Sequence, residues 1–435
     1  MSTKKAATGC SPSTTGMAHI QSRNHRQAGA YLEGEKHGLW ITASANADRP
    51  DHGGKPMTRE KPIVPVKWKH LSSKTGDLPV PPGSDQQTSC LILDADKDGL
   101  NDFILTCRNK GPAIVWYRHA MKGWMVYTIE KESIPIEAGC ACYDIDGDGD
   151  LDLVCGEDYQ GGNVYWWENP YPHFEPDTPW KRHLIKAGGA HQHHDQIFGD
   201  FDGDGKAELV FWNQGANKLF HAPIPKDPRV EPWPYREIFS GAGEGLAQGD
   251  IDGDGKIELL AGGRWFKYTP EGPFTAYTID PVQTHPRMAV GDLNGDGRLE
   301  VVMVPGDSVG RLKWYACQGD PKKTSDWTGQ DLLERDVIHG HTLAIADLNR
   351  DGHPDIFCAE MAKWTESRAT PDHPEATMWI FYGDGKGHFT KTEIATGFGV
   401  HEGKVGDMNG DGRPDIVAKP YNWETPRIDL WINEG

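Results

Sequence analysis

A nine-residue acidic motif recurs seven times along the chain of 435 residues and constrains its fold more than any other feature. Each copy reads Asp-x-Asp/Asn-x-Asp-Gly-x-x-Asp/Glu and precedes an apolar run, as in Asp200–Glu208. Oxygen-bearing side chains at positions 1, 3, 5 and 9, with glycine at position 6 for a sharp turn, suit a hard cation such as Ca²⁺. Because the copies return every 42 to 60 residues, they are an internal repeat, and the repeat determines the fold.

The side chains at positions 1, 3, 5 and 9 are the predicted Ca²⁺ ligands. In chain order they are Asp94, Asp96, Asp98 and Asp102; Asp144, Asp146, Asp148 and Asp152; Asp200, Asp202, Asp204 and Glu208; Asp250, Asp252, Asp254 and Glu258; Asp292, Asn294, Asp296 and Glu300; Asp347, Asn349, Asp351 and Asp355; and Asp407, Asn409, Asp411 and Asp415.

Between the motifs, short runs of β-branched and aromatic residues alternate with turns that contain glycine or asparagine. Examples of such runs are Glu208–Trp212, Val164–Trp167 and Leu312–Tyr315. No segment shows a sustained helical period of 3.6 residues. Four short strands in each repeat predict an all-β fold, a seven-bladed β-propeller with one blade per repeat and calcium-binding loops.

The two ends of the chain predict how the ring of blades closes. The last repeat stops after its third strand, Arg427–Ile432, and Val66–Leu71 resembles the missing outer strand. The N-terminal strand would complete the seventh blade and remove the open edge. We expect the propeller to span residues 61–435 and the polar segment 1–60 to be a disordered arm.

The acidity of the chain belongs to the motifs. The net charge is −19, but positions 1, 3, 5 and 9 of the motifs hold 25 of the 64 acidic residues, which leaves 39 against 45 lysines and arginines. The chain has no basic run, so we expect no nucleic-acid partner. It also has no run of about 20 apolar residues, so we expect no membrane span.

The eight cysteines lie mostly in apolar runs, as Cys90, Cys155 and Cys358 do. This placement favours buried free thiols over a disulfide framework. Free thiols favour an intracellular location, and the N-terminus shows no apolar signal-peptide segment, but localisation stays open.

Chemistry is expected on the face opposite the motifs, where the chain enters each innermost strand around the central channel. We call the ring of these seven entrances the funnel. Histidines placed at random in the sequence would not gather at one aligned position, or level, of these entrances. Six positions before the first aspartate of each motif stand Thr88, Ala138, His194, Glu244, Pro286, His341 and His401, and His193, His285, Arg287, His339 and Glu402 lie within two residues of that level.

Two kinds of chemistry fit imidazoles, a carboxylate and a guanidinium around one funnel. Neutral imidazoles and Glu244 would bind a transition metal such as Zn²⁺. Alternatively, a histidine removes a proton beside a carbonyl or carboxylate, and Arg287 or a metal holds the charge that develops. The candidate catalytic residues are His194, His341, His401, His285 and Arg287.

A sugar is the expected ligand, because aromatic side chains stack on its apolar face and planar polar groups meet its hydroxyls. The candidate substrate-binding residues are His193, Glu244, Arg264, Trp265, Tyr421 and Trp423.

The motif and aromatic strands such as Val164–Asn169 resemble the FG-GAP/VCBS repeat family of calcium-binding propellers, over roughly residues 66–433. Lys97 and Arg350 replace the usual glycine at position 4, which is not a ligand position. The arrangement of the funnel residues looks most like that of the carbohydrate-active members of this family, namely polysaccharide lyases and the propeller domain of aldos-2-ulose dehydratase. This resemblance implies β-elimination across a sugar C–O bond.

We therefore expect a carbon–oxygen lyase or dehydratase that acts on a sugar or uronic acid at the funnel. The alternative is a non-catalytic, Ca²⁺-stabilised propeller that binds a glycan or a protein partner. Histidines at several entrances favour the enzyme, because a binding module does not need imidazoles there.

Overall fold

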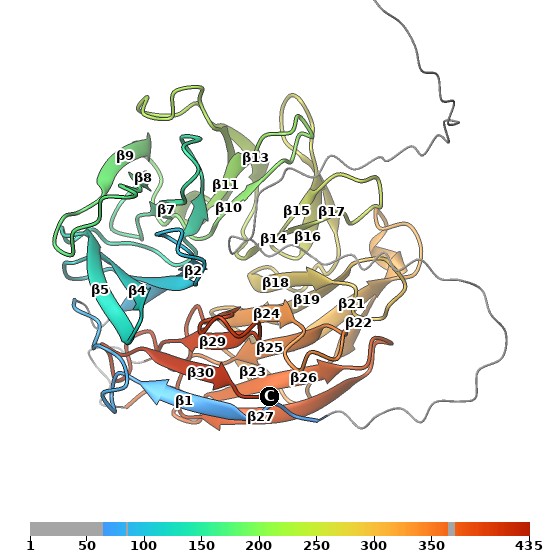
Figure 1. The fold of residues 1–435 in the computed structure, drawn as a ribbon. Coiled ribbons are helices and arrows are strands. Elements are labelled where there is room, and N and C mark those ends of the chain that lie inside the picture. The colour runs from blue at the N-terminus through green and yellow to red at the C-terminus, as the bar shows by residue number, and fades with distance from the viewer. Residues whose placement is uncertain (1–63, 84–85, 364–369) are drawn as a thin grey trace, which may run out of the picture. The chain divides into compact units, whose positions relative to one another are not determined.

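Residues 64–83, 86–363 and 370–435 are described in the computed structural model, and they form an all-β fold (Figure 1). Within these ranges, helix is limited to two 3₁₀ segments, η1 (Gln214–Ala216) and η2 (Thr324–Asp326). No helix in the same ranges has the length and apolar character needed to cross a membrane. The predicted arm, residues 1–60, lies outside the described residues.

The described strands form seven four-stranded antiparallel sheets, which we number as blades in chain order, naming the strands of each from the innermost outward. Blade 1 contains β2 (Gln87–Leu93), β3 (Asp102–Cys107), β4 (Ile114–Ala120) and β5 (Gly123–Glu130); blade 2 contains β6 (Ala141–Tyr143), β7 (Asp152–Gly156), β8 (Val164–Glu168) and β9 (Lys181–Lys186); blade 3 contains β10 (Gln196–Gly199), β11 (Glu208–Asn213), β12 (Lys218–Pro223) and β13 (Arg236–Ser240).

The remaining blades follow the same pattern. Blade 4 contains β14 (Leu246–Gly249), β15 (Glu258–Ala261), β16 (Arg264–Lys267) and β17 (Thr275–Thr278); blade 5 contains β18 (Pro286–Gly291), β19 (Glu300–Pro305), β21 (Lys313–Cys317) and β22 (Trp327–Asp331); blade 6 contains β24 (Thr342–Ala346), β25 (Asp355–Ala359), β26 (Thr377–Gly383) and β27 (Phe389–Thr396); blade 7 contains β28 (Lys404–Gly406), β29 (Asp415–Ala418), β30 (Asp429–Asn433) and β1 (Trp68–Ser72). A two-stranded sheet of β20 (Val309–Gly310) and β23 (Val337–Ile338) lies beside β19.

The innermost strands contact one another in a closed circle. β2 contacts β6, and the contacts continue through β10, β14, β18, β24 and β28 back to β2. This cyclic order of antiparallel blades around one centre is a seven-bladed β-propeller, which confirms the predicted architecture (Figure 1).

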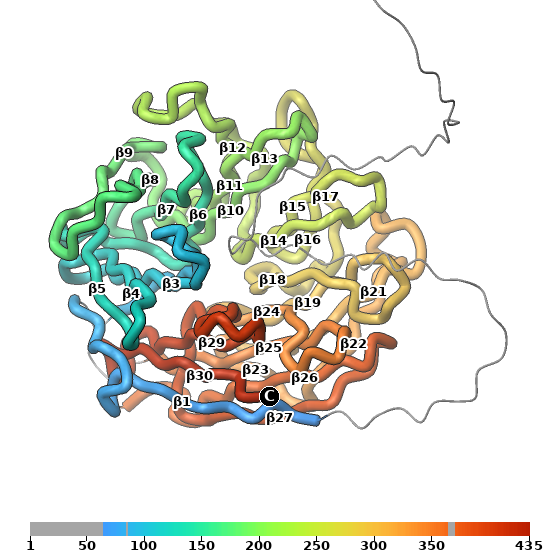
Figure 2. The backbone as a smooth tube through the Cα atoms, in the orientation of Figure 1, coloured from blue at the N-terminus to red at the C-terminus, as the bar shows by residue number. Residues whose placement is uncertain are grey.

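Strand β1 closes the ring from the N-terminal side. It pairs with β30 in a register that sets Trp68 opposite Asn433 and Ser72 opposite Asp429. In Figure 2 this blue segment runs along the red C-terminal strand. The prediction that an N-terminal strand completes the last blade is therefore confirmed, with the strand beginning at Trp68 rather than Val66.

Aromatic side chains fill the spaces between neighbouring blades. Trp116 and Trp167 belong to one cluster between blades 1 and 2, and Trp265 and Tyr315 to another between blades 4 and 5. The three tryptophans have no exposed surface. Truncating such a side chain to alanine typically lowers the free energy of unfolding by ~3–5 kcal/mol. The packing of each pair of blades therefore depends on the aromatic side chains between them.

Cys140 and Cys155 form a disulfide, so the prediction of free thiols is wrong for this pair. The antiparallel register of β6 and β7 sets Ala141 opposite Val154, and the two cysteines, one step further along the same ladder, have Cα atoms 4.6 Å apart. That separation is within the range a disulfide bridges. Cys90, Cys142, Cys317 and Cys358 are free thiols, while Cys10 lies outside the described residues.

Removing β1 should open the ring. A variant that lacks residues 1–75 leaves the edge of β30 unpaired, so we expect it to lose soluble, cooperatively folding protein. A variant that lacks residues 1–60 keeps β1 and should fold. Size-exclusion chromatography and thermal melts of the two variants measure the difference. A cooperative melt for the longer deletion would show that the seam closes in another way.

Candidate functional site

Each acidic loop lies between the innermost and the second strand of its blade. In all seven blades the position 1 aspartate directly follows the innermost strand, and the position 9 acid is the first residue of the second strand. In blade 3, for example, Asp200 follows β10 and Glu208 begins β11. The loops therefore share one face of the propeller, and the entrances to the innermost strands lie on the other.

The glycine at position 6 has a structural role in every loop. Its backbone N–H donates to the position 1 carboxylate at 2.7 to 3.1 Å. Its φ lies between +78° and +91° in all seven loops. This left-handed conformation favours glycine, so the motif needs glycine to fold back onto its first aspartate.

The position 9 acid connects its loop to the blade. In every loop one of its oxygens accepts the backbone N–H of position 2, at 2.8 to 3.2 Å. In blades 1, 2, 6 and 7, where this acid is aspartate, the other oxygen accepts a backbone N–H from the third strand or the residue after it, namely from His119, Asn169, Gly383 and Asn433.

The electrostatics of the loops fit a bound cation. Carboxylate oxygens of at least three ligand positions lie within 4.8 Å of one another in each of blades 1 to 4. Burial raises the pKa of Asp102 and of Asp152 to about 8, and burial together with neighbouring aspartates raises that of Glu300 to about 7. Because crowded, buried carboxylates are unfavourable alone and all offer hard oxygen ligands, the side chains at positions 1, 3, 5 and 9 suit Ca²⁺.

Removal of Ca²⁺ should destabilise the propeller. We expect a chelator to lower the melting temperature markedly and excess Ca²⁺ to restore it, because a cation that binds only the folded loops stabilises the folded state. Calorimetry in EGTA, then with Ca²⁺ and, as a control, with Mg²⁺, which demands a stricter geometry, measures this effect. An unchanged melt in excess chelator, with no metal found by elemental analysis, would contradict the assignment.

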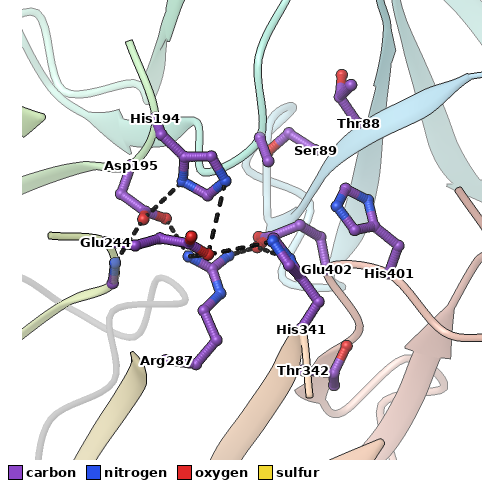
Figure 3. A network of polar contacts seen from close by, with 12 residues as sticks. Thr88, Ser89, His194, Asp195, Glu244, Arg287, His341, Thr342, His401 and Glu402 are labelled. Carbon is purple, nitrogen blue, oxygen red and sulfur yellow. Dashed lines mark hydrogen bonds and ion pairs between the residues drawn. The ribbon is translucent and has the colours of Figure 1, made fainter. Parts of the chain in front are cut away.

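On the opposite face, the funnel brings together four residues of the aligned level, from blades 3, 4, 6 and 7 (Figure 3). Nε2 of His194 lies 3.9 Å from Oε1 of Glu244, and Nε2 of His341 lies 3.1 Å from the same oxygen. The ring centroids of His341 and His401 are 4.4 Å apart. All four side chains are buried, although they are up to 207 residues apart in sequence.

Arg287 lies at the centre of this group between two carboxylates (Figure 3). One guanidinium nitrogen donates to Oδ1 of Asp195 at 2.6 Å and lies 3.9 Å from Oε1 of Glu244. The other contacts Glu402, whose second oxygen is 3.0 Å from Nζ of Lys404. The two carboxylates fix the direction of the guanidinium from both sides.

Asp195 and Glu402 adopt an unusual backbone conformation. Both lie five residues before the first aspartate of their loops, and both have a φ of +54°. The equivalent residues in blades 2 and 4 are Gly139 and Gly245, with φ of +81° and +71°. A left-handed non-glycine residue costs ~1–3 kcal/mol. The chain thus keeps carboxylates at two positions where glycine would be less strained, which points to a requirement for their charges beside Arg287.

The funnel histidines have opposed proton affinities. Burial lowers the pKa of His194, but the charges of Asp195 and Glu244 outweigh it and raise the pKa to about 9. Burial and the charge of Arg287 lower the pKa of His341. Burial, together with the neighbouring His341 and Lys419, lowers the pKa of His401 well below its usual range. Near neutral pH, His194 is therefore an imidazolium, and His341 and His401 are neutral imidazoles.

An open pocket of about 350 Å³ lies against the network. Glu244 belongs to both the pocket and the network, and Oδ1 of Asp307, another lining residue, is 3.7 Å from Nε2 of His341. His341 therefore lies directly behind two carboxylates of the lining. The pocket is lined by Gln192, Gln214, Glu244, His285, Asp307 and Ser308, a set of amide, hydroxyl, imidazole and carboxylate groups that suits a ligand rich in hydroxyls.

The other candidate catalytic and substrate-binding residues take separate places. His285 is exposed and lines the pocket without a recorded contact to the buried network. The ring of Tyr421 packs on His401 at 5.0 Å and its hydroxyl accepts a hydrogen bond from Arg108. Trp423 is partly buried.

Three candidate substrate-binding residues lie away from the pocket. His193 is fully buried, with its ring nitrogens 3.3 Å from carbonyl oxygens of Trp212 and Gly162. Trp265 is buried between blades and donates to the carbonyl of Pro321, and Arg264 donates to the carbonyl of Gly262. None of the three lines the pocket, so a role in substrate binding remains a prediction without a contact that supports it.

The sequence placed Glu402 beside the aligned level, but the candidate catalytic and substrate-binding residues did not include Asp195, Glu402 or Asp307. For Asp195 and Glu402 a signal was present, because acids replace glycine at a position where two other blades keep it. Asp307 carries no such signal, because it lies in the turn after β19 and reaches His341 only in the folded chain.

The donor set of the funnel also fits the predicted transition metal by ligand type. His194, Glu244 and His341 each offer one atom within 4.8 Å of the others, and Oε1 of Glu244 has no hydrogen-bond partner among the described residues. A metal there would polarise an oxygen of a bound ligand. However, Arg287 lies 3.9 Å from the same Glu244 oxygen and supplies a positive charge at that place.

Comparisons with solved structures agree on the fold alone. The chain is similar to virginiamycin B lyase from Staphylococcus aureus (10% identity, 84% of this chain and 99% of that one, TM-score 0.51) and to BBS1N in complex with ARL6DN (9%, 85% and 98%, TM-score 0.50). Its structural neighbours also include the rhamnogalacturonan lyase YesW (14%, 89% and 75%, TM-score 0.47). A comparison with curated proteins found no match.

The family match rests on the repeats themselves. FG-GAP-like repeats are matched over residues 144–211, 200–261, 250–303, 292–358 and 347–418, which together span more than half of the chain. The chain belongs to the FG-GAP-like repeat family.

Proposed function

We propose that the funnel catalyses β-elimination on a sugar that carries a carbonyl or carboxylate group, by general acid–base catalysis. One observation carries this proposal. Two imidazoles of opposed proton affinity, His194 and His341, share the carboxylate of Glu244 at the floor of an open pocket. Paired groups whose environments push their pKa values apart are typical of an acid and a base in one site.

His341 is the proposed base. It is neutral near pH 7, and its Nε2 faces the pocket lining between Glu244 and Asp307. It removes the proton on the carbon next to the carbonyl or carboxylate. Arg287, held by Asp195 and Glu402, places a fixed positive charge beside this group and stabilises the enolate-like charge that forms.

His194 is the proposed acid. Its Nδ1–H donates to Asp195 at 2.7 Å, which leaves the Nε2–H directed to the Glu244 side of the site. As the electron pair of the broken C–H bond forms the new C=C bond, the C–O bond on the next carbon breaks. The departing oxygen takes the proton of His194 and leaves as water or as the alcohol of a shortened sugar chain. His401 packs on His341 at 4.4 Å and keeps that ring in place.

Alanine substitutions test these roles. We expect His194→Ala and His341→Ala to lower turnover by ~10²–10⁴-fold, the usual cost of losing a positioned acid or base. His401→Ala should lower turnover less, because His401 acts only by holding the ring of His341. Turnover is measured as new ultraviolet absorbance of an unsaturated product, across uronic-acid polymers and 2-keto sugars. His183→Ala is the matched control, because His183 is equally buried and ion-paired with Glu168 but lies in an outer strand.

Three outcomes would contradict the roles. Full activity in all three variants would refute the funnel site and favour a glycan- or protein-binding module. A melting temperature that falls with activity in the funnel variants, but not in His183→Ala, would assign these histidines to structure. Stoichiometric Zn²⁺ in the wild type that is lost in His194→Ala and His341→Ala would make them ligands of a metal instead.

The pH profile tests the assignment of the acid. Because His194 must carry its proton and has a pKa of about 9, kcat/KM should fall as the pH rises through about 9. Asp195→Asn removes the charge that raises this pKa, so its alkaline limb should move to lower pH. Glu402→Gln, at the equivalent position but without a contact to His194, should leave the limb in place. Identical alkaline limbs in all three proteins would exclude His194 as the acid.

A further inference from the structure

The seven acidic loops differ at position 3. In blades 5, 6 and 7 this position is asparagine, whereas blades 1 to 4 have aspartate. In three of those four blades a basic side chain contacts the aspartate directly: Arg118 contacts Asp96, Arg229 contacts Asp146 and Lys267 contacts Asp252. These basic residues come from the third strand or a later loop, and so from outside the motif.

Lys267 makes the most complete set of these contacts. It is the last residue of β16, next to Phe266, which pairs with Leu259 directly after the position 9 acid Glu258. Its Nζ contacts Asp252, lies 2.7 Å from Oδ2 of Asp254 and 3.6 Å from Oε1 of Glu258. One ammonium group thus reaches three of the four ligand positions of its loop.

Two ammonium groups approach the acids of this loop, and Lys267 is the nearer of the two. Lys322 adds a second ammonium 3.6 Å from Asp252. Two lysines of the chain itself therefore offset part of the charge of the four acids in the loop of blade 4.

The loop of blade 3 is the contrasting case. Its four acids lie within 4.8 Å of one another, as those of blade 4 do. Among the described residues, the ion pairs recorded for it are those of Lys206 with Asp204 and of His221 with Glu208, both at 3.6 Å. Lys206 has 82% of its side chain exposed, so water screens its charge. This loop combines four carboxylates with little internal compensation.

We infer that the loops bind Ca²⁺ unequally, with Lys267 acting as a built-in cation that competes with Ca²⁺ in blade 4 and the loop of blade 3 binding Ca²⁺ most tightly. Both loops have the same four acids at the same positions, so they differ in the internal cation and not in the ligand set. Ca²⁺ affinity in such loops rises with the number of uncompensated carboxylates. This inference is independent of the proposed elimination activity.

Substitution of Lys267 tests the competition on the full chain. After removal of bound metal, Ca²⁺ binding is measured by equilibrium dialysis and stability by calorimetry. Lys267→Met should add one Ca²⁺ site or strengthen one by about tenfold or more, and should melt at a lower temperature than the wild type in chelator. Lys218→Met is the matched control, because Lys218 is a strand lysine of similar exposure that pairs with Glu237, outside every acidic loop, and should change neither measurement.

A second pair of variants ranks the two loops and does not depend on the folding of Lys267→Met. Asp202→Asn and Asp252→Asn make the same change at position 3 of neighbouring loops. Asp202→Asn should remove or weaken the tightest Ca²⁺ site, whereas Asp252→Asn should leave that site unchanged. Loss of the tightest site in Asp252→Asn, or unchanged Ca²⁺ binding and apo stability in Lys267→Met, would overturn the inference.

Discussion

The propeller depends on the acidic loop that joins the innermost strand of each blade to the second. Two carboxylates, at positions 1 and 9, accept backbone N–H groups from the loop itself, so the turn is held from both ends before any cation binds. In four blades the position 9 acid also reaches the third strand. The same acids are crowded and buried, so the interaction that shapes the blade also creates a need for positive charge. Lys267 supplies positive charge, asparagine at position 3 removes one negative charge, and Ca²⁺ is the cation that we propose for the remaining acids.

The same electrostatic constraint acts on the funnel with a different result. Five entrances, those of blades 3 to 7, bring together three carboxylates, an arginine and three imidazoles. These side chains have very little exposed surface. Buried charges at such density are stable only when they are paired. Arg287 pairs with Asp195 and Glu402, and this leaves Glu244 between His194 and His341. The two histidines therefore meet the same carboxylate in different electrostatic surroundings, with the pKa of His194 raised and that of His341 lowered.

The sequence predicted the blade count, the loop positions and the closing strand because each depends on a local repeat with fixed spacing. It also aligned His194, Glu244, His341 and His401 at one level, since equivalent positions of a closed ring face the same centre. The sequence-based predictions were wrong or incomplete where a contact depends on how strands from different parts of the chain pair and pack. The Cys140–Cys155 disulfide depends on the pairing of β6 with β7. Trp265 packs between two blades and does not line the pocket. Asp307 approaches His341 from a turn whose path no sequence motif predicts.

The backbone at Asp195 and Glu402 shows which features of the funnel reflect more than folding. A propeller entrance that requires a positive φ is satisfied by glycine, as blades 2 and 4 show. Replacing glycine by an acid at two such entrances adds strain and places a charge in a buried site, so stability alone does not favour either residue. Both acids contact Arg287, and Asp195 also raises the pKa of His194. Their common effect is to orient one guanidinium and to keep one imidazole protonated, and the β-propeller fold requires neither.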